Sequence, residues 1–319
     1  MIIPLFDATI NEVADKLLSI RLEGGVIALS RVLTLLVPVG AASAEEAIEA
    51  ANQSSMEHPC RLIVLIEGDP TGKSALDAEI RVGGDAGASE VVVLRLRGQM
   101  IDHQDSLVVP LLLPDVPVVT WWPDRVPDVP ADTPLGAVAE RRVTDSRMAE
   151  GSLAERLTRL SQGYRPGDTD LAWTSLTWWR AHLASLLDQP PFEPVTRVVV
   201  VGRVEHPTPV LLATWLGWKL HCQADVETVE STATLQRVEL HRSSGVISLD
   251  RPQGTSTTTL TMPSGQVRRF QLPPPSLSDS LSEELRRLDA DTLYGEVIKR
   301  SLAWLQRGDH LTETTQVEG

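Results

Sequence analysis

Short apolar runs rich in β-branched residues alternate with amphipathic segments along this chain, and this alternation limits the fold to a mixed α/β type. The runs have the length of buried strands, and in the first half they cover residues 30–39, 61–67, 75–82, 90–96 and 116–122. Four amphipathic segments begin with Ser/Thr-x-x-Glu, a pattern in which the hydroxyl and the carboxylate cap each other's backbone amides. These segments start at Thr9, Ser43, Ser152 and Ser280, and they predict helices over 10–23, 44–57, 152–163 and 279–290.

Residues 161–170, SQGYRPGDTD, have no apolar pattern and contain two glycines and a proline, which is typical of a connection. They predict a boundary between an N-terminal α/β domain, residues 1–165, and a C-terminal α/β domain, residues 166–319. The first domain is expected to be a mixed sheet with flanking helices.

The second domain is expected to combine a strand–helix unit with an antiparallel meander and closing helices. Its elements should be a long helix over about 170–188, a buried strand Val195–Val201, a helix Pro207–Leu220, a meander over 224–272 and two final helices. Glycine and proline pairs near residues 243–245, 252–254 and 263–265 mark the turns of the meander. Both domains therefore contain a sheet.

The composition excludes several classes of protein. The 319 residues carry a formal net charge of −14, so we expect no binding to nucleic acid or to an anionic membrane, because both depend on basic side chains. No apolar run approaches the roughly 18 residues of a spanning helix, and the N-terminus lacks the apolar stretch of a signal peptide. The two cysteines, Cys60 and Cys222, fit neither a disulfide framework nor a zinc site. We expect a cytoplasmic protein.

The string Gly68-Asp-Pro-Thr-Gly-Lys-Ser74 resembles a phosphate-binding P-loop. A P-loop has four residues between its glycines and leads into a helix, so that backbone amides surround the phosphates. Here three residues separate Gly68 from Gly72, Pro70 lacks an amide hydrogen, and the residues that follow alternate as in a strand. The string therefore predicts a turn between two strands.

A second possible anion site follows the strand that ends near Val201. Gly202 and Arg203 lead through His206 to Thr208, where a helix should begin, and the N-terminus of a helix can bind an anion. The alternative is an ordinary strand–helix connection capped by Thr208. The chain has no other pattern typical of a catalytic or metal site, so we expect neither, and no cofactor.

Tryptophan is unusually frequent, with eight residues beside three Phe and two Tyr. Trp121 and Trp122 are neighbours on an expected strand and so point to opposite sides of it. On the helix that follows residue 170, Ala172, Leu176, Trp179, Leu183 and Leu186 form an apolar seam, whereas Trp178 falls on the polar side. A tryptophan there either packs within the chain or anchors a partner.

Four strings carry a resemblance to a known family, and they are SMEHPCRLIVL, DSLVVPLLLPDVPVVTWWP, RRVTDS and DLAWTSLTWWR. Together they resemble the glucose-6-phosphate dehydrogenase assembly protein family, OpcA, in its actinobacterial type, over residues 25 to 310. The resemblance implies a non-catalytic factor without a cofactor. It binds glucose-6-phosphate dehydrogenase, promotes its assembly or activation, and thereby supports the pentose phosphate pathway and NADPH production.

Three hypotheses follow. The first is this assembly factor, with Trp121, Trp122 and Trp178 as candidate partner-binding residues. The second is a phosphate-binding sensor or a small-molecule enzyme that uses Gly202, Arg203, His206 and Thr208. The third is a structural subunit of another complex. The sequence leaves self-association open.

The Gly68–Ser74 string generates a first prediction. Because its glycine spacing and the strand-like residues after it do not fit a P-loop, we expect the purified protein to hydrolyse no ATP. The measurement is phosphate release with ATP and Mg²⁺. Hydrolysis that disappears in Lys73→Ala would contradict this interpretation.

Overall fold

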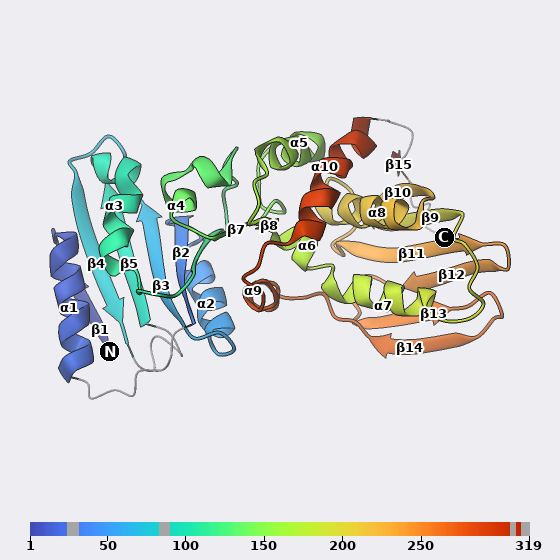
Figure 1. Ribbon diagram of the computed structural model, residues 1–319, viewed down its shortest axis with the longest axis horizontal. Coiled ribbons are helices and arrows are strands. Elements are labelled where there is room, and N and C mark those ends of the chain that lie inside the picture. Colours follow the sequence, from blue (N-terminus) through green and yellow to red (C-terminus); the bar gives the residue numbers. More distant parts are fainter. Residues whose placement is uncertain (24–31, 83–89, 307–310, 314–319) are drawn as a thin grey trace. The chain divides into compact units, whose positions relative to one another are not determined.

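A computed structural model describes residues 1–23, 32–82, 90–306 and 311–313, and the chain forms two compact units (Figure 1). Unit 1 consists of residues 1–149, 164–171 and 276–291, and unit 2 of residues 150–163, 172–275 and 292–319. The chain therefore passes from one unit to the other five times, after residues 149, 163, 171, 275 and 291. A single cut at residue 165 does not reproduce this division, because residues 150–163 lie in unit 2 and residues 276–291 in unit 1.

Unit 1 contains a mixed sheet, as the sequence predicts, and it has eight strands where the sequence indicated five. Its strands, in spatial order, are β1 (Ile2–Leu5), β4 (Ala75–Arg81), β5 (Glu90–Arg97), β3 (Cys60–Glu67), β2 (Leu33–Gly40), β6 (Val118–Trp122), β7 (Arg141–Thr144) and β8 (Asp168–Asp170). The strands from β5 to β8 are parallel to their neighbours, whereas β4 and β1 are antiparallel. The order β5-β3-β2-β6-β7-β8 is that of a doubly wound sheet, which the chain builds outward from β2 in both directions.

Both faces of the central strands are buried, which explains why they read as continuous apolar runs. Leu35 and Val37 of β2 belong to one apolar cluster, together with residues of α2 (Ala44–Ser55). Leu36 belongs to a second cluster on the opposite face, together with residues of α1 (Ile10–Glu23). The short helices α3 (Gln104–Val108) and α4 (Pro134–Ala137) and the 3₁₀ turns Gly98–His103, Val109–Leu111 and Pro130–Asp132 complete the connections.

The predicted capping boxes are confirmed at two of four helices. The Thr9 amide donates to Glu12 Oε2 at 2.7 Å and the Glu12 amide to Thr9 Oγ1 at 3.3 Å, and Ser152 and Glu155 make the same pair of bonds at the start of α5 (Leu153–Gly163). The helix after Ser43 begins as expected, but the Ser43 side chain makes no capping bond.

The prediction of a start at Ser280 is wrong by one turn. The helix α9 (Leu277–Leu285) is capped by Ser276, whose hydroxyl accepts from the Asp279 amide while the Asp279 carboxylate accepts from the Ser276 amide. Aspartate thus takes the place of the Glu that the pattern expects. Ser280 lies inside the helix and donates to the Ser276 carbonyl at 2.9 Å.

Unit 2 contains a seven-stranded sheet (Figure 1). Its strands, in spatial order, are β14 (Val267–Gln271), β13 (Thr257–Thr261), β12 (Gly245–Asp250), β11 (Leu235–Arg242), β9 (Arg197–Arg203), β10 (Gln223–Val229) and β15 (Leu311–Glu313). The antiparallel meander begins at β11, not at residue 224. The strand β10 pairs in parallel with β9 instead, because the helix α8 (Pro207–Leu220) between them is a crossover connection.

The long helix expected over 170–188 is divided into α6 (Leu171–Thr174) and α7 (Thr177–Leu187). At the break, Ser175 Oγ donates to the Ala172 carbonyl at 2.9 Å and Thr177 Oγ1 to the Thr174 carbonyl at 2.8 Å. Such side-chain bonds compete with the helical backbone bonds. The helix α10 (Thr292–Gln306) packs against α5 and α8 within unit 2, so only one of the two closing helices belongs to the C-terminal sheet.

A buried ion pair holds α9 in unit 1. Arg141 of β7 donates to the Glu284 carboxylate, and both side chains are more than nine-tenths buried. Arg141 also donates to the Asp289 carbonyl at 2.6 Å. Beside this pair, Leu281 and Leu285 join the apolar cluster that contains α2.

This ion pair generates a second prediction. Removing the Glu284 carboxylate leaves the Arg141 charge buried without its partner, so Glu284→Ala should lower the free energy of unfolding by about 3–5 kcal/mol. The matched control is Glu283→Ala on the same helix, which removes a partly exposed pair with Arg286 and should cost about 0–1 kcal/mol. Urea denaturation of the full chain measures both, and equal effects would contradict the assigned role.

Candidate partner-binding surface

The helix α7 packs its predicted apolar seam into unit 2. Leu176, Trp179, Leu183 and Leu186 are all buried, as is Ala172 before the helix break. The guanidinium of the buried Arg251 lies 5.3 Å from the centre of the Trp179 ring and donates to two backbone carbonyls, of Leu272 and Leu235. Burial lowers the pKa of Arg251. These contacts fix which side of α7 faces outward.

Trp178 lies on that outward side, and 58% of its surface is exposed, compared with 3% for Trp179. One turn further along α7, the ring of His182 stacks on Phe270 of β14, with 4.5 Å between ring centres and 31° between planes. Arg268 lies two residues before Phe270 and therefore on the same face of β14. We call Trp178, His182, Arg268 and Phe270 the α7–β14 surface.

Sequence reasoning found Trp178 but missed the β14 residues of this surface. His182 and Phe270 are separated by 88 positions, and only the fold brings their rings together. The available signal was the adjacent pair Arg268-Arg269 in the predicted meander of an acidic chain.

Trp121 and Trp122 are both buried, with 0% and 6% of their surfaces exposed. They do point to opposite sides of β6, but β6 lies between β2 and β7 in a sheet that is covered on both faces. Neither side chain presents a surface to a partner, so Trp178 is the exposed member of the three candidates.

The turn from β9 to α8 uses its own polar groups internally. Nδ1 of His206, not the Thr208 hydroxyl, caps α8 by accepting from the Thr208 amide at 3.3 Å. The Thr208 hydroxyl donates to the Ala172 carbonyl at 3.3 Å. Gly202 is needed for packing, because a Cβ there would lie 2.4 Å from Pro209 Cγ. Arg203 is exposed.

A carboxylate of the chain itself also lies beside this turn. The Glu205 carboxylate accepts from the Leu153 amide at 2.6 Å and lies 3.7 Å from Arg156. The Glu205 backbone adopts a positive φ of 53°, and its carbonyl accepts from Arg156. An anion bound here would compete with this carboxylate for Arg156.

A second position that could bind a ligand lies in the doubly wound sheet of unit 1, at the ends of β2 and β6, where such sheets bind ligands. There the Asp124 carboxylate accepts from the Gly40 amide at 2.9 Å, in the turn that leads into α2. Nearby, Glu67 accepts from Arg125 at 2.6 Å and from Gln104 at 2.9 Å. The chain's own carboxylate therefore takes the amide that a ligand oxygen would use.

The string RRVTDS forms a buried polar network at the end of β7. The Asp170 carboxylate accepts from Thr144 Oγ1 at 2.6 Å, from the Ser146 amide at 2.9 Å and from Ser146 Oγ at 2.7 Å. Arg142 pairs with Asp168, whose pKa is raised by burial even though this arginine opposes the rise. The network joins β7 to β8 and is structural, because its polar atoms satisfy one another.

The string Gly68–Ser74 is a turn between β3 and β4, which confirms the prediction. Asp69 accepts from the Thr71 amide at 2.8 Å and from Thr71 Oγ1 at 2.7 Å, and these bonds lower the pKa of Asp69. No helix begins at Lys73, so the amide arrangement of a P-loop is not formed.

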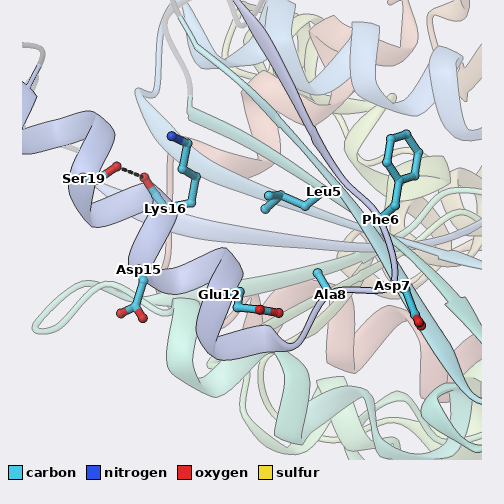
Figure 2. A pocket seen from close by; sticks show the side chains of 8 residues that line it. All are labelled: Leu5, Phe6, Asp7, Ala8, Glu12, Asp15, Lys16 and Ser19. Carbon is cyan, nitrogen blue, oxygen red and sulfur yellow. Dashed lines mark hydrogen bonds between the residues drawn. The ribbon is translucent and has the colours of Figure 1, made fainter.

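A shallow hollow of about 490 Å³ lies between α1 and the end of β1 (Figure 2). Figure 2 shows that Leu5 points toward α1 while Phe6, 78% exposed, points away from it. The Glu12 carboxylate caps α1, and the backbone hydrogen bond from Thr9 lowers its pKa. The lining residues are Leu5, Phe6, Asp7, Ala8, Glu12, Asp15, Lys16 and Ser19.

Within the described residues, no group of three or more His, Cys, Asp or Glu side chains is placed to hold a metal ion. In the same part of the chain, no helix is both long and apolar enough to cross a bilayer.

The fold and these contacts define an α/β protein of two units. In the turn before α2 and at the start of α8, side chains of the chain itself accept from the backbone amides. The α7–β14 surface, by contrast, is exposed. Two family models match the chain, the glucose-6-phosphate dehydrogenase subunit N-terminal domain over residues 51–162 and the corresponding C-terminal domain over residues 166–298. The chain belongs to this glucose-6-phosphate dehydrogenase assembly family, OpcA, as the four strings indicate.

The remaining comparisons are less informative. No curated protein matches the chain. One solved structure, described as trehalose-6-phosphate from E. coli bound with UDP-2-fluoro glucose, is 10% identical in sequence, with a TM-score of 0.26. The match covers 62% of this chain and 64% of that one.

The β9–α8 turn generates a third prediction. Because His206 satisfies an amide at the start of a buried helix, His206→Ala should lower the free energy of unfolding by about 1 kcal/mol. The control is His103→Ala at an exposed position, for which we expect less than about 0.5 kcal/mol. Denaturant titration measures both. An unchanged stability in His206→Ala would remove His206 from the capping role.

Proposed function

We propose that this protein is a non-catalytic, cytoplasmic assembly factor that binds glucose-6-phosphate dehydrogenase and promotes its active oligomer. Through the enzyme it would support the oxidative pentose phosphate pathway and the production of NADPH. Membership of the family named for a subunit of that dehydrogenase supports the choice of partner.

The observation that carries the proposal is the exposed Trp178. Its neighbour on the same helix, Trp179, is packed inside unit 2, whereas Trp178 is not. Exposing a large aromatic side chain forgoes the free energy that burial would bring. Tryptophan and arginine are the residues most enriched at the energetic centres of interfaces, and both occur in the α7–β14 surface.

The phosphate-binding alternative receives less support. His206 and Thr208 use their polar atoms in bonds to the chain itself, and Gly202 is held against Pro209. Arg203 is exposed but lies beside a turn that already contains the Glu205 carboxylate. We therefore keep the assembly factor as the single proposed function.

The direct experiment mixes the purified protein with glucose-6-phosphate dehydrogenase. Light scattering reports the size of the complex and of the enzyme's oligomer, and the rate of NADPH formation reports its activity. We expect a larger particle and a faster rate. No change in either quantity over a range of protein concentrations would refute the proposed function.

The role of Trp178 generates a fourth prediction. Truncating an interface anchor costs ~2 kcal/mol or more, a loss of roughly thirtyfold in affinity, so Trp178→Ala should weaken binding to the dehydrogenase by at least that factor. Its melting temperature should stay near that of the wild type, because the side chain is largely exposed. The control is Phe192→Ala, which removes another exposed aromatic residue of unit 2.

A lowered melting temperature combined with unchanged binding by Trp178→Ala would assign this side chain to the fold. An equal loss of binding in Phe192→Ala would show that any exposed aromatic residue contributes, and the anchor role would then be wrong. Calorimetric titration supplies the affinities.

A further inference from the structure

The strand β14 forms one edge of the unit 2 sheet (Figure 1, orange). Among the described residues it pairs only with β13, in antiparallel register from Thr257 opposite Gln271 to Thr261 opposite Val267. Four of its five residues are exposed, and Phe270 is half-buried. The outer edge of β14 is therefore a row of backbone groups that another strand can join.

The register shows which backbone groups face that open edge. The Met262 amide donates to the Gln266 carbonyl at 2.9 Å, and the Leu272 amide donates to the Ser256 carbonyl at 2.7 Å. Hydrogen-bonded pairs recur at every second residue of an antiparallel ladder, so Arg268 and Phe270 also bond toward β13. The amide and carbonyl groups of Val267, Arg269 and Gln271 point outward.

The side chains along this edge are basic. Arg268 and Arg269 are exposed, and within the described residues neither makes an ion pair or a side-chain hydrogen bond. As neighbours on a strand they lie on opposite faces. Arg268 lies on the face of the His182–Phe270 stack, and Arg269 on the other. The chain as a whole is nevertheless strongly acidic, with a formal net charge of −14.

We propose that β14 receives an extended, acidic segment of the partner as an additional strand, and this inference rests on the proposed function. Outward amides and carbonyls would supply main-chain hydrogen bonds, the usual source of affinity in strand addition. Acidic residues at adjacent positions of the incoming segment would point to opposite faces and meet Arg268 and Arg269 separately. Trp178 and Phe270 would border the same segment on the α7 side.

The charge pattern favours this occupant over a second copy of the chain. Two β14 strands paired with each other would bring four arginines together, and like charges opposite one another destabilise a strand pair. Charged edge strands are also a common defence against self-association. Acidic side chains of an incoming segment would instead be attracted to the same arginines.

The first test reverses the charges. Arg268→Glu combined with Arg269→Glu should weaken binding to the dehydrogenase by roughly tenfold or more and reverse the effect of salt on it. The matched control reverses the adjacent exposed residues Arg286 and Arg287, which directly follow α9 in unit 1, and it changes the net charge equally. Equal losses in the two double variants would refute a specific basic edge.

The second test separates the backbone from the side chain. Arg269→Pro removes an outward amide and leaves the ladder with β13 intact, because proline is tolerated at an edge position that does not donate. Arg269→Gln removes the charge alone. Strand addition predicts that Arg269→Pro binds at least several-fold more weakly than Arg269→Gln, and equal affinities would refute it. If Arg269→Pro melts early, Val267→Pro against Val267→Ala repeats the comparison at another outward amide.

The controls keep this inference distinct from the proposed function. If the wild-type protein neither binds nor activates the dehydrogenase, the proposed function fails. If the wild type binds while all the β14 variants bind equally well, only the strand addition fails. Light scattering of the protein alone tests the competing occupant. A dimer that the Arg269→Pro variant abolishes would assign the edge to self-association and overturn the proposal.

Discussion

Unit 1 includes the helix α9, which in the sequence follows most of unit 2. The Arg141–Glu284 pair and the side chains of Leu281 and Leu285 then close the region beside α2. Because a buried charge without its partner is strongly destabilising, β7 depends on a segment that follows it by more than a hundred residues. A fragment that ends near residue 165 would therefore lack part of its own core, and functional work on this protein needs the full chain.

In the doubly wound sheet of unit 1, side chains of the chain itself make hydrogen bonds at the position where such sheets usually bind a ligand. The position at the ends of β2 and β6 is where such sheets bind nucleotides. Here Asp124 accepts from the Gly40 amide, and Glu67 accepts from both Arg125 and Gln104. Function is a property of sites and not of folds, and the candidate partner-binding residues of this chain lie elsewhere.

The candidate partner-binding groups lie on unit 2, on the helix α7 and the edge strand β14. The seam of α7 and the contact of Trp179 with Arg251 determine that Trp178 faces outward. The His182–Phe270 stack joins this helix to β14. A rigid scaffold thus presents an aromatic anchor beside an open strand edge, which is an arrangement suited to recognising a protein partner.

Local patterns in the sequence were sufficient for most of the elements and for the family. The apolar runs, the capping boxes at Thr9 and Ser152 and the alternation over 75–82 depend on neighbouring residues, so they could be read without the fold. The side of α7 that carries Trp178 followed from helical periodicity. The strings that identify the family are likewise contiguous.

Only the tertiary structure decided the properties that depend on distant contacts. Trp121 and Trp122 are buried because β6 lies inside a sheet covered on both faces. His206 is the cap of α8 because the helix begins at Pro207, which places Thr208 inside the first turn, with its hydroxyl bonded to the Ala172 carbonyl. The parallel pairing of β10, the return of α9 to unit 1 and the position of Arg268 and Arg269 on an open edge are also non-local. Short-range patterns record propensity and periodicity, whereas burial and strand order are set by segments that meet only when the chain has folded.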